Sequence, residues 1–272
     1  MGIVFRQSAK NTIVSVMGAV LGAFIILLST KYTTKQQLGF TRNLTNYAVA
    51  FSQFLLLGIH STMVVYIHNY TNDIRKSKTL ITISLLLPTI VACLFTIIIF
   101  FFKSWILTHF QPDDIPFMQR YFMWLPVFTI LFMYMMVLEQ YLISQLKVAI
   151  SAFMREVLLR FANIILILLY GFGYIDFDVL VIGTILIYLL PVFIFLFLSL
   201  GMKNFGFSLR LRSFSNTEYK EMAHFSWYHF LLMIAMLLMN YLDALSLPFY
   251  DHKGFVSVAI YSVAVYLVSF VG

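Results

Sequence analysis

The sequence predicts an all-α integral membrane protein: a polytopic bundle of about eight transmembrane helices, with a first six-helix lobe and the start of a second. The 272 residues are 61% hydrophobic and only 11% charged, with a mean hydropathy of +0.92. Soluble domains carry about 25% charged residues, so this chain cannot cover a water-facing surface. Apolar runs of about 20 residues, the length that crosses a bilayer, recur along the whole chain. Helices are favoured because the ~10-residue alternating segments of membrane barrels are absent from the sequence.

The apolar runs place the expected spans in order, and short polar segments separate them. The expected spans are 12–31, 44–67, 79–102, 117–144, 157–175, 179–201, 223–249 and 254–272. Arg6 and Lys10 precede the first run, and further spans follow without a clear cleavage site, so we interpret it as a retained helix and not a signal peptide. On this helix Ser15, Gly18 and Gly22 form a face of small residues, which predicts close helix packing.

The longest polar segment, Gly201 to Met222, follows the sixth span and divides the chain. We therefore predict a first six-helix bundle over 1–201, a cytoplasmic connector over 202–222, and the first two helices of a second bundle over 223–272. In the connector, Ser215 or Asn216 followed by Glu218 predicts a helix start. The last span stops at Gly272 without a flanking charge or polar tail, so we expect the second bundle to be truncated.

The basic residues predict the orientation, because cytoplasmic segments of membrane proteins are enriched in lysine and arginine. With the N-terminus inside, twelve basic residues lie on the inner side and six on the outer side. The inner set is Arg6, Lys10, Arg75, Lys76, Lys78, Lys147, Arg155, Arg160, Lys203, Arg210, Arg212 and Lys220; the outer set is Lys31, Lys35, Arg42, Lys103, Arg120 and Lys253. This count favours a cytoplasmic N-terminus.

Two spans each carry a stripe of polar residues, and polar groups within a membrane are expected to be functional. Asn46, Gln53 and His60 recur on one face of the second span. His229, Asn240 and Asp243 form a similar stripe along the seventh span. We interpret the stripes as the lining of a water-filled substrate cavity. The alternative is that these side chains only form hydrogen bonds between helices.

Two carboxylates are candidates for ion coupling. Glu139 lies well inside the fourth span, and Asp243 lies near the outer end of the seventh. A carboxylate in a desolvated site can exchange a proton between conformational states, so each is a candidate for proton or cation coupling. Arg160 is expected to pair with Glu156 one helical turn earlier, as an anchor at the inner face.

Several function classes are excluded by what the sequence lacks. No GxxxxGK[ST] or HExxH motif occurs, so no catalytic residue, cofactor or metal site is predicted. The six histidines are scattered, and the single cysteine, Cys93, lies within a span. The pair Asp113–Asp114 stands between two prolines in a short loop, where a turn explains it. A net charge of +7 suggests nucleic acid, but the charges flank the spans and form no exposed basic stripe.

Three segments resemble a known family. They are "GIVFRQSAKNTIVSVMGAVLG" (Gly2 to Gly22), "KQQLGFTRNL" (Lys35 to Leu44) and "NYLDALSLPFYDHKGFVSVAIYSVAVY" (Asn240 to Tyr266). Together they resemble bacterial polysaccharide flippases, the O-antigen and exopolysaccharide translocases of the multidrug/oligosaccharidyl-lipid/polysaccharide exporter superfamily. In the third segment Ala259 stands where that family usually has a glycine, so this match is looser.

The resemblance implies a non-enzymatic flippase of two helical bundles that acts by alternating access during surface polysaccharide biosynthesis. Its expected partners are the lipid bilayer, a polyprenyl-pyrophosphate-linked oligosaccharide and other polysaccharide-assembly proteins, with no nucleic acid. The alternatives are a multidrug or lipid II exporter of the same superfamily, or a membrane-embedded polymerase or acyltransferase. In a flippase of this kind, arginines often bind the pyrophosphate. The span boundaries above, however, place no arginine in the middle of a span.

Overall fold

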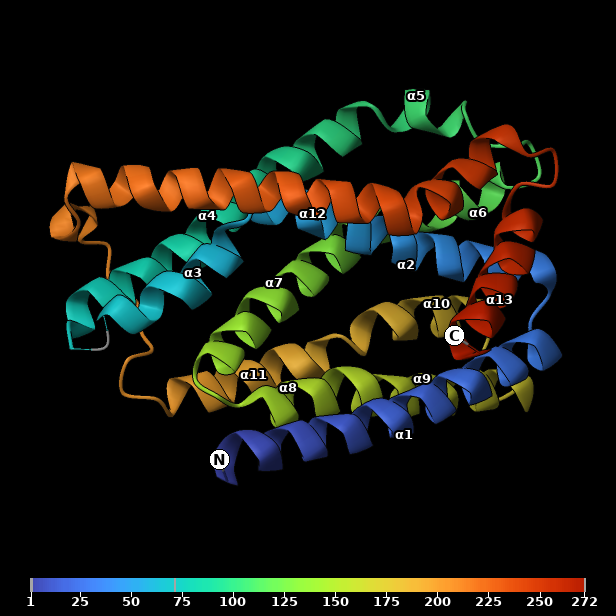
Figure 1. The fold of residues 1–272 in the computed structure, drawn as a ribbon. Coiled ribbons are helices and arrows are strands. Elements are labelled where there is room, and N and C mark those ends of the chain that lie inside the picture. The colour runs from blue at the N-terminus through green and yellow to red at the C-terminus, as the bar shows by residue number, and fades with distance from the viewer. Residues whose placement is uncertain (1, 71, 272) are drawn as a thin grey trace.

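The computed structural model is built of helices, with no strand among the described residues, and this confirms the all-α fold class (Figure 1). The backbone is described for residues 2–70 and 72–271, and the side chains for 12–70, 72–210 and 212–268. The helices are α1 Gly2–Tyr32, α2 Lys35–Leu56, α3 Ile59–Ile67, η1 His68–Tyr70, α4 Ile74–Phe101, α5 Lys103–Leu107, α6 Ile115–Tyr121, α7 Trp124–Ser144, α8 Val148–Phe153, the π turn η2 Met154–Leu158, α9 Leu159–Gly171, α10 Phe177–Leu186, α11 Leu189–Leu200, η3 Leu211–Ser213, α12 Asn216–Tyr250 and α13 Phe255–Val271.

The chain has several helices long and apolar enough to cross a membrane, so it is a membrane protein. Five described segments meet that description: 12–32, 74–101, 124–144, 177–200 and 216–250. The bent pair α2 and α3 makes a sixth. The expected span 157–175 is corrected: it falls in a helix that a π turn divides and that holds Arg155, Glu156 and Arg160. The expected span 254–272 corresponds to the shorter apolar helix α13, and its last residue lies outside the described part of the chain.

The second span is broken and not continuous as the sequence predicts. Leu57 and Gly58 adopt left-handed backbone angles (φ 47° and 74°), and the axes of α2 and the α3–η1 segment differ by 57°. A Cβ on Gly58 would lie 2.3 Å from the carbonyl oxygen of Ser226, so α12 packs directly on the break. Only glycine allows both the positive φ and this close approach.

Helix α1 packs along α8 and α9 through its small residues (Figure 1). A Cβ on Gly18 would lie 2.9 Å from Cβ of Glu156, and one on Gly22 would lie 2.8 Å from Nη1 of Arg160. The expected close packing of this face is therefore confirmed at both glycines. It brings α1 against the charged side chains of the neighbouring helix.

Helix α12 begins at Asn216, and the expected start is confirmed. The Ser215 side chain accepts a hydrogen bond from the Glu218 backbone, and the Glu218 side chain accepts one from the Ser215 backbone. This reciprocal capping box satisfies two otherwise unpaired donors of the first turn. The polar connector consequently ends at residue 215, earlier than the boundary of 222 taken from hydropathy.

Helix α13 is held against α2 by an acidic residue of the loop before α6. Asp114, only 2% exposed, accepts a 2.7 Å hydrogen bond from the backbone N–H of Phe255 and a 3.0 Å bond from Nε2 of Gln36. A Cβ on Gly39 would overlap the carbonyl oxygen of Phe255, so α2 and α13 are in backbone contact. The sequence predicted only a turn at Asp113–Asp114. In the structure Asp114 also caps a helix about 140 residues away in sequence.

Candidate functional site: an arginine-lined cavity

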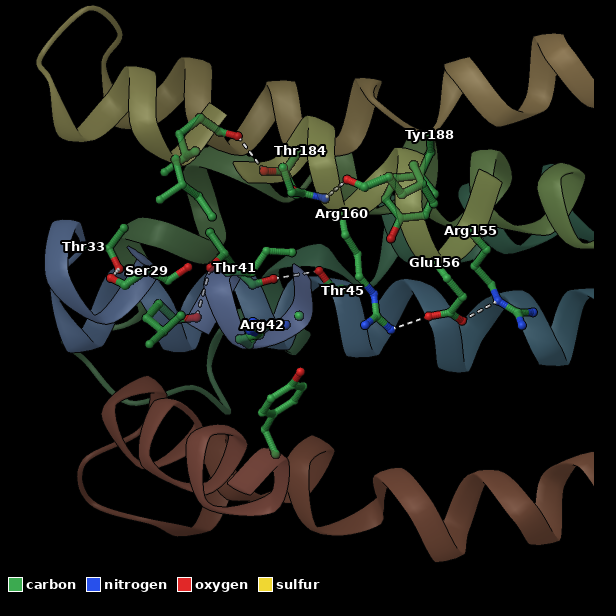
Figure 2. A pocket seen from close by; sticks show the side chains of 18 of the residues that line it. Ser29, Thr33, Thr41, Arg42, Thr45, Arg155, Glu156, Arg160, Thr184 and Tyr188 are labelled. Carbon is green, nitrogen blue, oxygen red and sulfur yellow. Dashed lines mark hydrogen bonds and ion pairs between the residues drawn. The ribbon is translucent and has the colours of Figure 1, made fainter. Parts of the chain in front are cut away.

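A cavity of about 440 Å³ lies among α1, α2, α7, η2, α9, α10 and α13 (Figure 2). Its charged lining residues are Arg42, Arg155, Glu156 and Arg160, and we call it the arginine cavity. Polar side chains of Thr41, Thr45 and Asn163 also line it. Its volume falls in the range of small-molecule sites, roughly 300–1,000 Å³. A charged cavity of this size inside an apolar bundle is a candidate binding site.

Arg42 enters the cavity from α2, because that helix starts earlier than hydropathy suggests. Thr34 accepts a hydrogen bond from the Gln37 backbone and the Gln37 side chain accepts one from Thr34, so the helix begins at Lys35. Arg42 lies seven residues later, about 10 Å along the helix at 1.5 Å per residue. Its side chain is partly buried, and it forms no ion pair with any described carboxylate.

The other charges form a chain from α7 to α9. Arg155 lies 3.0 Å from Oε1 of Glu139 and 3.1 Å from Oε1 of Glu156, and Arg160 lies 2.5 Å from Oε2 of Glu156. Arg160 also donates a hydrogen bond to the backbone carbonyl of Gly18 on α1. Figure 2 shows Glu156 between the two arginines. The expected pair of Arg160 and Glu156 is confirmed, but it faces the cavity and is more than an anchor at the inner face.

The π turn explains how neighbouring charges reach the same cavity. Arg155 and Glu156 lie within η2, where the helix is locally wider than an α-helix. Such π turns inside α-helices are rare and occur frequently at functional sites. Here the π turn lies between α8 and α9, opposite the two glycines of α1, and presents both side chains to the cavity.

The cavity holds more positive than negative charge. Three arginines and one glutamate line it, a surplus of two positive charges. Glu139, which is 4% exposed and bonded to Arg155, reduces that surplus to one. Because Arg155 and Arg160 are already paired, the surplus corresponds to Arg42. An isolated cation inside an apolar bundle is costly unless an anion compensates it.

The six residues expected to line a cavity lie elsewhere. His60 and His229 do meet: their ring centroids are 5.8 Å apart, across α3 and α12. Asn46 and Gln53 are partly buried on α2. Asn240 and Asp243 are exposed on α12, where Asn240 donates to the Met236 carbonyl and Asp243 accepts from the Tyr261 hydroxyl. The arginine cavity contains none of these six residues.

Sequence reasoning missed the arginines as cavity residues: the expected spans placed none in the middle of a span, whereas the structure places Arg42 within helix α2. Arg42 was assigned to an outer loop, because the second span was taken to begin only at residue 44. Arg160 was counted with the inner charges, although it lies near the start of the expected span 157–175. A signal was present: Thr34 followed three residues later by Gln37 is a capping-box pattern that predicts a helix start at Lys35. No comparable local pattern marks Arg155 and Arg160, whose position depends on the π turn.

Known proteins add no identification, and the described side chains suggest no metal centre. No family model, curated protein or solved structure matches this chain. Within the described part of the chain, no cluster of three or more His, Cys, Asp or Glu residues has the arrangement to hold a metal ion. The arginine cavity and the membrane-spanning helices are therefore the features that bear on function.

Proposed function

We propose that this protein is a flippase that moves a polyprenyl-pyrophosphate-linked oligosaccharide across a bacterial inner membrane, as the sequence resemblance implies. The observation that carries the proposal is Arg42, a guanidinium without a described carboxylate partner in a cavity of about 440 Å³ within the bundle. The substrate's pyrophosphate supplies the missing negative charge. Guanidinium groups bind phosphate oxygens through two parallel hydrogen bonds, which favours arginine over lysine there.

The remaining lining suits the sugar next to the pyrophosphate. Thr41 and Thr45 donate their hydroxyl hydrogens to carbonyl groups of their own helix, at 3.0 and 2.9 Å, so their oxygens can accept hydrogen bonds from a ligand. Tyr188 and Asn163 add polar groups to the wall. The lipid tail would remain in the bilayer while the cavity opens alternately to each side.

The charge of the cavity favours this reading over the main alternatives. A multidrug exporter of cationic compounds is disfavoured, because a positive surplus repels such substrates. Lipid II carries a pyrophosphate too, so a lipid II exporter of the same superfamily remains the second candidate. An acyltransferase would need a histidine with a positioned partner, but Nδ1 of His60 is buried without a hydrogen-bond partner.

Ion coupling is part of the proposal. Glu139 is buried and bonded to Arg155 in the wall of the cavity. Protonation of Glu139 would leave Arg155 paired with Glu156 alone and raise the net positive charge at the cavity, which links a proton to substrate affinity. Asp243, exposed on α12, is the other candidate and would act outside the arginine cavity.

The test is transport of a fluorescent lipid-linked oligosaccharide in proteoliposomes that contain the purified protein. Arg42→Gln should reduce transport at least tenfold, Arg42→Lys should retain part of it, and Lys253→Gln should leave it unchanged, because Lys253 is exposed on a loop. A tenfold loss corresponds to about 1.4 kcal/mol, close to the lower end of the roughly 1.5–3 kcal/mol that a hydrogen bond to a charged group contributes. Wild-type transport rates in Arg42→Gln would refute the role of the cavity.

A lipid II analogue distinguishes the two candidates. Under the proposal, transport of the polysaccharide intermediate exceeds transport of the lipid II analogue, and Arg42→Gln weakens both. Transport of lipid II alone would assign the chain to the alternative, and the absence of transport with both would refute the flippase proposal.

A further inference from the structure

The polar segment between α11 and α12, residues 201–215, is fixed to the bundle at three points, and we call it the connector. Phe205 is buried against Tyr141 with ring centroids 5.1 Å apart, and Phe214 is buried against Tyr70 at 5.2 Å. Between them, the Ser208 backbone N–H donates to Oγ1 of Thr82 at 2.8 Å. The connector is therefore an ordered segment that packs against α4, α7 and η1.

Three arginines surround a hollow of about 490 Å³ between the connector and α4. Arg75 of α4 and Arg210 and Arg212 of the connector line the hollow, together with Leu209 and Ser213. All three arginines are exposed, and none forms an ion pair with a described carboxylate. The neighbouring acids have other partners: Asp73 accepts from the Arg75 and Lys76 backbones, and Glu218 pairs with Lys76 at 2.8 Å.

Apolar side chains lie exposed beside the same hollow. Phe207 and Leu209 are 66% and 73% exposed, although they belong to an ordered segment. The hollow is lined by the first turn of α4 and by the part of the connector that precedes α12, and both helices are long and apolar enough to cross a membrane. Beside the ends of such helices, exposed apolar side chains can enter the acyl region while arginines reach the headgroups.

We infer that this hollow binds the phosphate of an anionic phospholipid. Guanidinium groups pair with phosphate oxygens, and clusters of basic residues at a membrane surface attract anionic lipids. The phosphate would lie among Arg75, Arg210 and Arg212, and the acyl chains would pack on Phe207 and Leu209. The bound lipid would join the connector to α4, and this site lies apart from the arginine cavity, with which it shares no lining residue.

Lipid retention tests this site directly. The purified full chain is equilibrated with mixed micelles of phosphatidylglycerol and phosphatidylcholine, and the retained lipid is counted by native mass spectrometry. Arg210→Gln with Arg212→Gln should lower phosphatidylglycerol retention relative to phosphatidylcholine, by roughly fivefold for each arginine removed. Lys203→Gln with Lys220→Gln is the matched control, because these exposed lysines lie at the same end but outside the hollow. Equal retention by the two double variants would overturn the inference.

A second measurement separates the lipid from a soluble anion and does not depend on the arginine variants. In Phe207→Trp, made in a background in which Trp105, Trp124 and Trp227 are replaced by phenylalanine, the tryptophan emission should shift to the blue in phosphatidylglycerol vesicles and be quenched by brominated acyl chains. Inorganic phosphate added to the protein in neutral detergent should leave that emission unchanged. A shift caused by inorganic phosphate alone, or no quenching by brominated chains, would overturn the assignment to a phospholipid.

Discussion

The hydroxyl of Ser226 on α12 donates a 2.8 Å hydrogen bond to the backbone carbonyl of Leu57, at the break between α2 and α3. A break within a span frees backbone groups that a continuous helix would pair, and in a membrane a neighbouring side chain must satisfy them. The same region places Gly58 in backbone contact with α12 and brings His60 and His229 together. The break is thus one of the places where α12 packs against α2 and α3.

Ser226→Ala removes this hydrogen bond without adding bulk. We expect the variant to lose about 1 kcal/mol of stability, because it deprives a buried carbonyl of a hydrogen-bond donor. Thermal unfolding of the purified protein in detergent measures the effect. Ser246→Ala on the same helix is the control, since the Ser246 hydroxyl bonds only within α12, to the Asp243 carbonyl. Equal melting temperatures for both variants would contradict the role of Ser226.

Asp114 makes the junction of α13 with α2 sensitive to mutation. Asp114→Ala leaves the Phe255 backbone N–H buried without its acceptor, which should cost about 1–3 kcal/mol. Asp113→Ala serves as the neighbouring control, because Asp113 is exposed and contributes only its backbone carbonyl to Gln36. Chemical unfolding that finds the two variants equally stable would show that Asp114 does not hold α13.

The same carboxyl should give a pH-dependent stability. Burial raises the pKa of Asp114 above its ordinary value of 3.8, although hydrogen bonds from Gln36 and Phe255 oppose the shift. With a raised pKa the folded state binds the proton more tightly than the unfolded chain, so this contribution is present at low pH and is lost as pH rises through the folded pKa. The stability of the wild type relative to Asp114→Asn should therefore increase as pH falls from neutral toward about 4. A difference that does not change over this range would contradict the assignment.

Glu139 and Arg155 should be energetically coupled. Glu139→Gln removes a buried partner of Arg155 and should destabilise the protein by about 1–2 kcal/mol, less than for a fully buried pair because the Arg155 side chain is 50% exposed. The double variant with Arg155→Gln should lose less than the sum of the single variants. Glu221→Gln, an exposed change on α12, should have no effect. Additive losses in unfolding experiments would exclude the coupling.

The orientation with a cytoplasmic N-terminus stays a prediction, and cysteine labelling in intact cells tests it. In a Cys93→Ala background, cysteines at Asp113 and Lys253 should react with an impermeant maleimide, whereas cysteines at Asn72 and Lys220 should react only after the cells are opened. All four positions are exposed, so accessibility to reagent reflects the side of the membrane. The opposite labelling pattern would reverse the orientation.

The sequence alone determined the features that depend on local chemistry or on composition. The apolar runs predicted a helical membrane bundle, since a bilayer demands long helices with internally paired backbones. The pattern from Ser215 to Glu218 predicted the start of α12, and the four-residue spacing predicted the pair of Glu156 and Arg160. Each of these depends on residues within one or two helical turns.

The tertiary structure decided which side chains share a cavity. Arg42 counts as a loop charge until α2 is known to begin at Lys35, and it becomes the uncompensated cation only when η2 and α7 supply the partners of the other arginines. The break at Leu57 depends on contact with α12, about 170 residues later. Asp114 has the sequence context of an ordinary turn residue, and only the contact with Phe255 of α13 gives it a role. Contacts between distant segments decide burial and charge balance, and no local pattern encodes them.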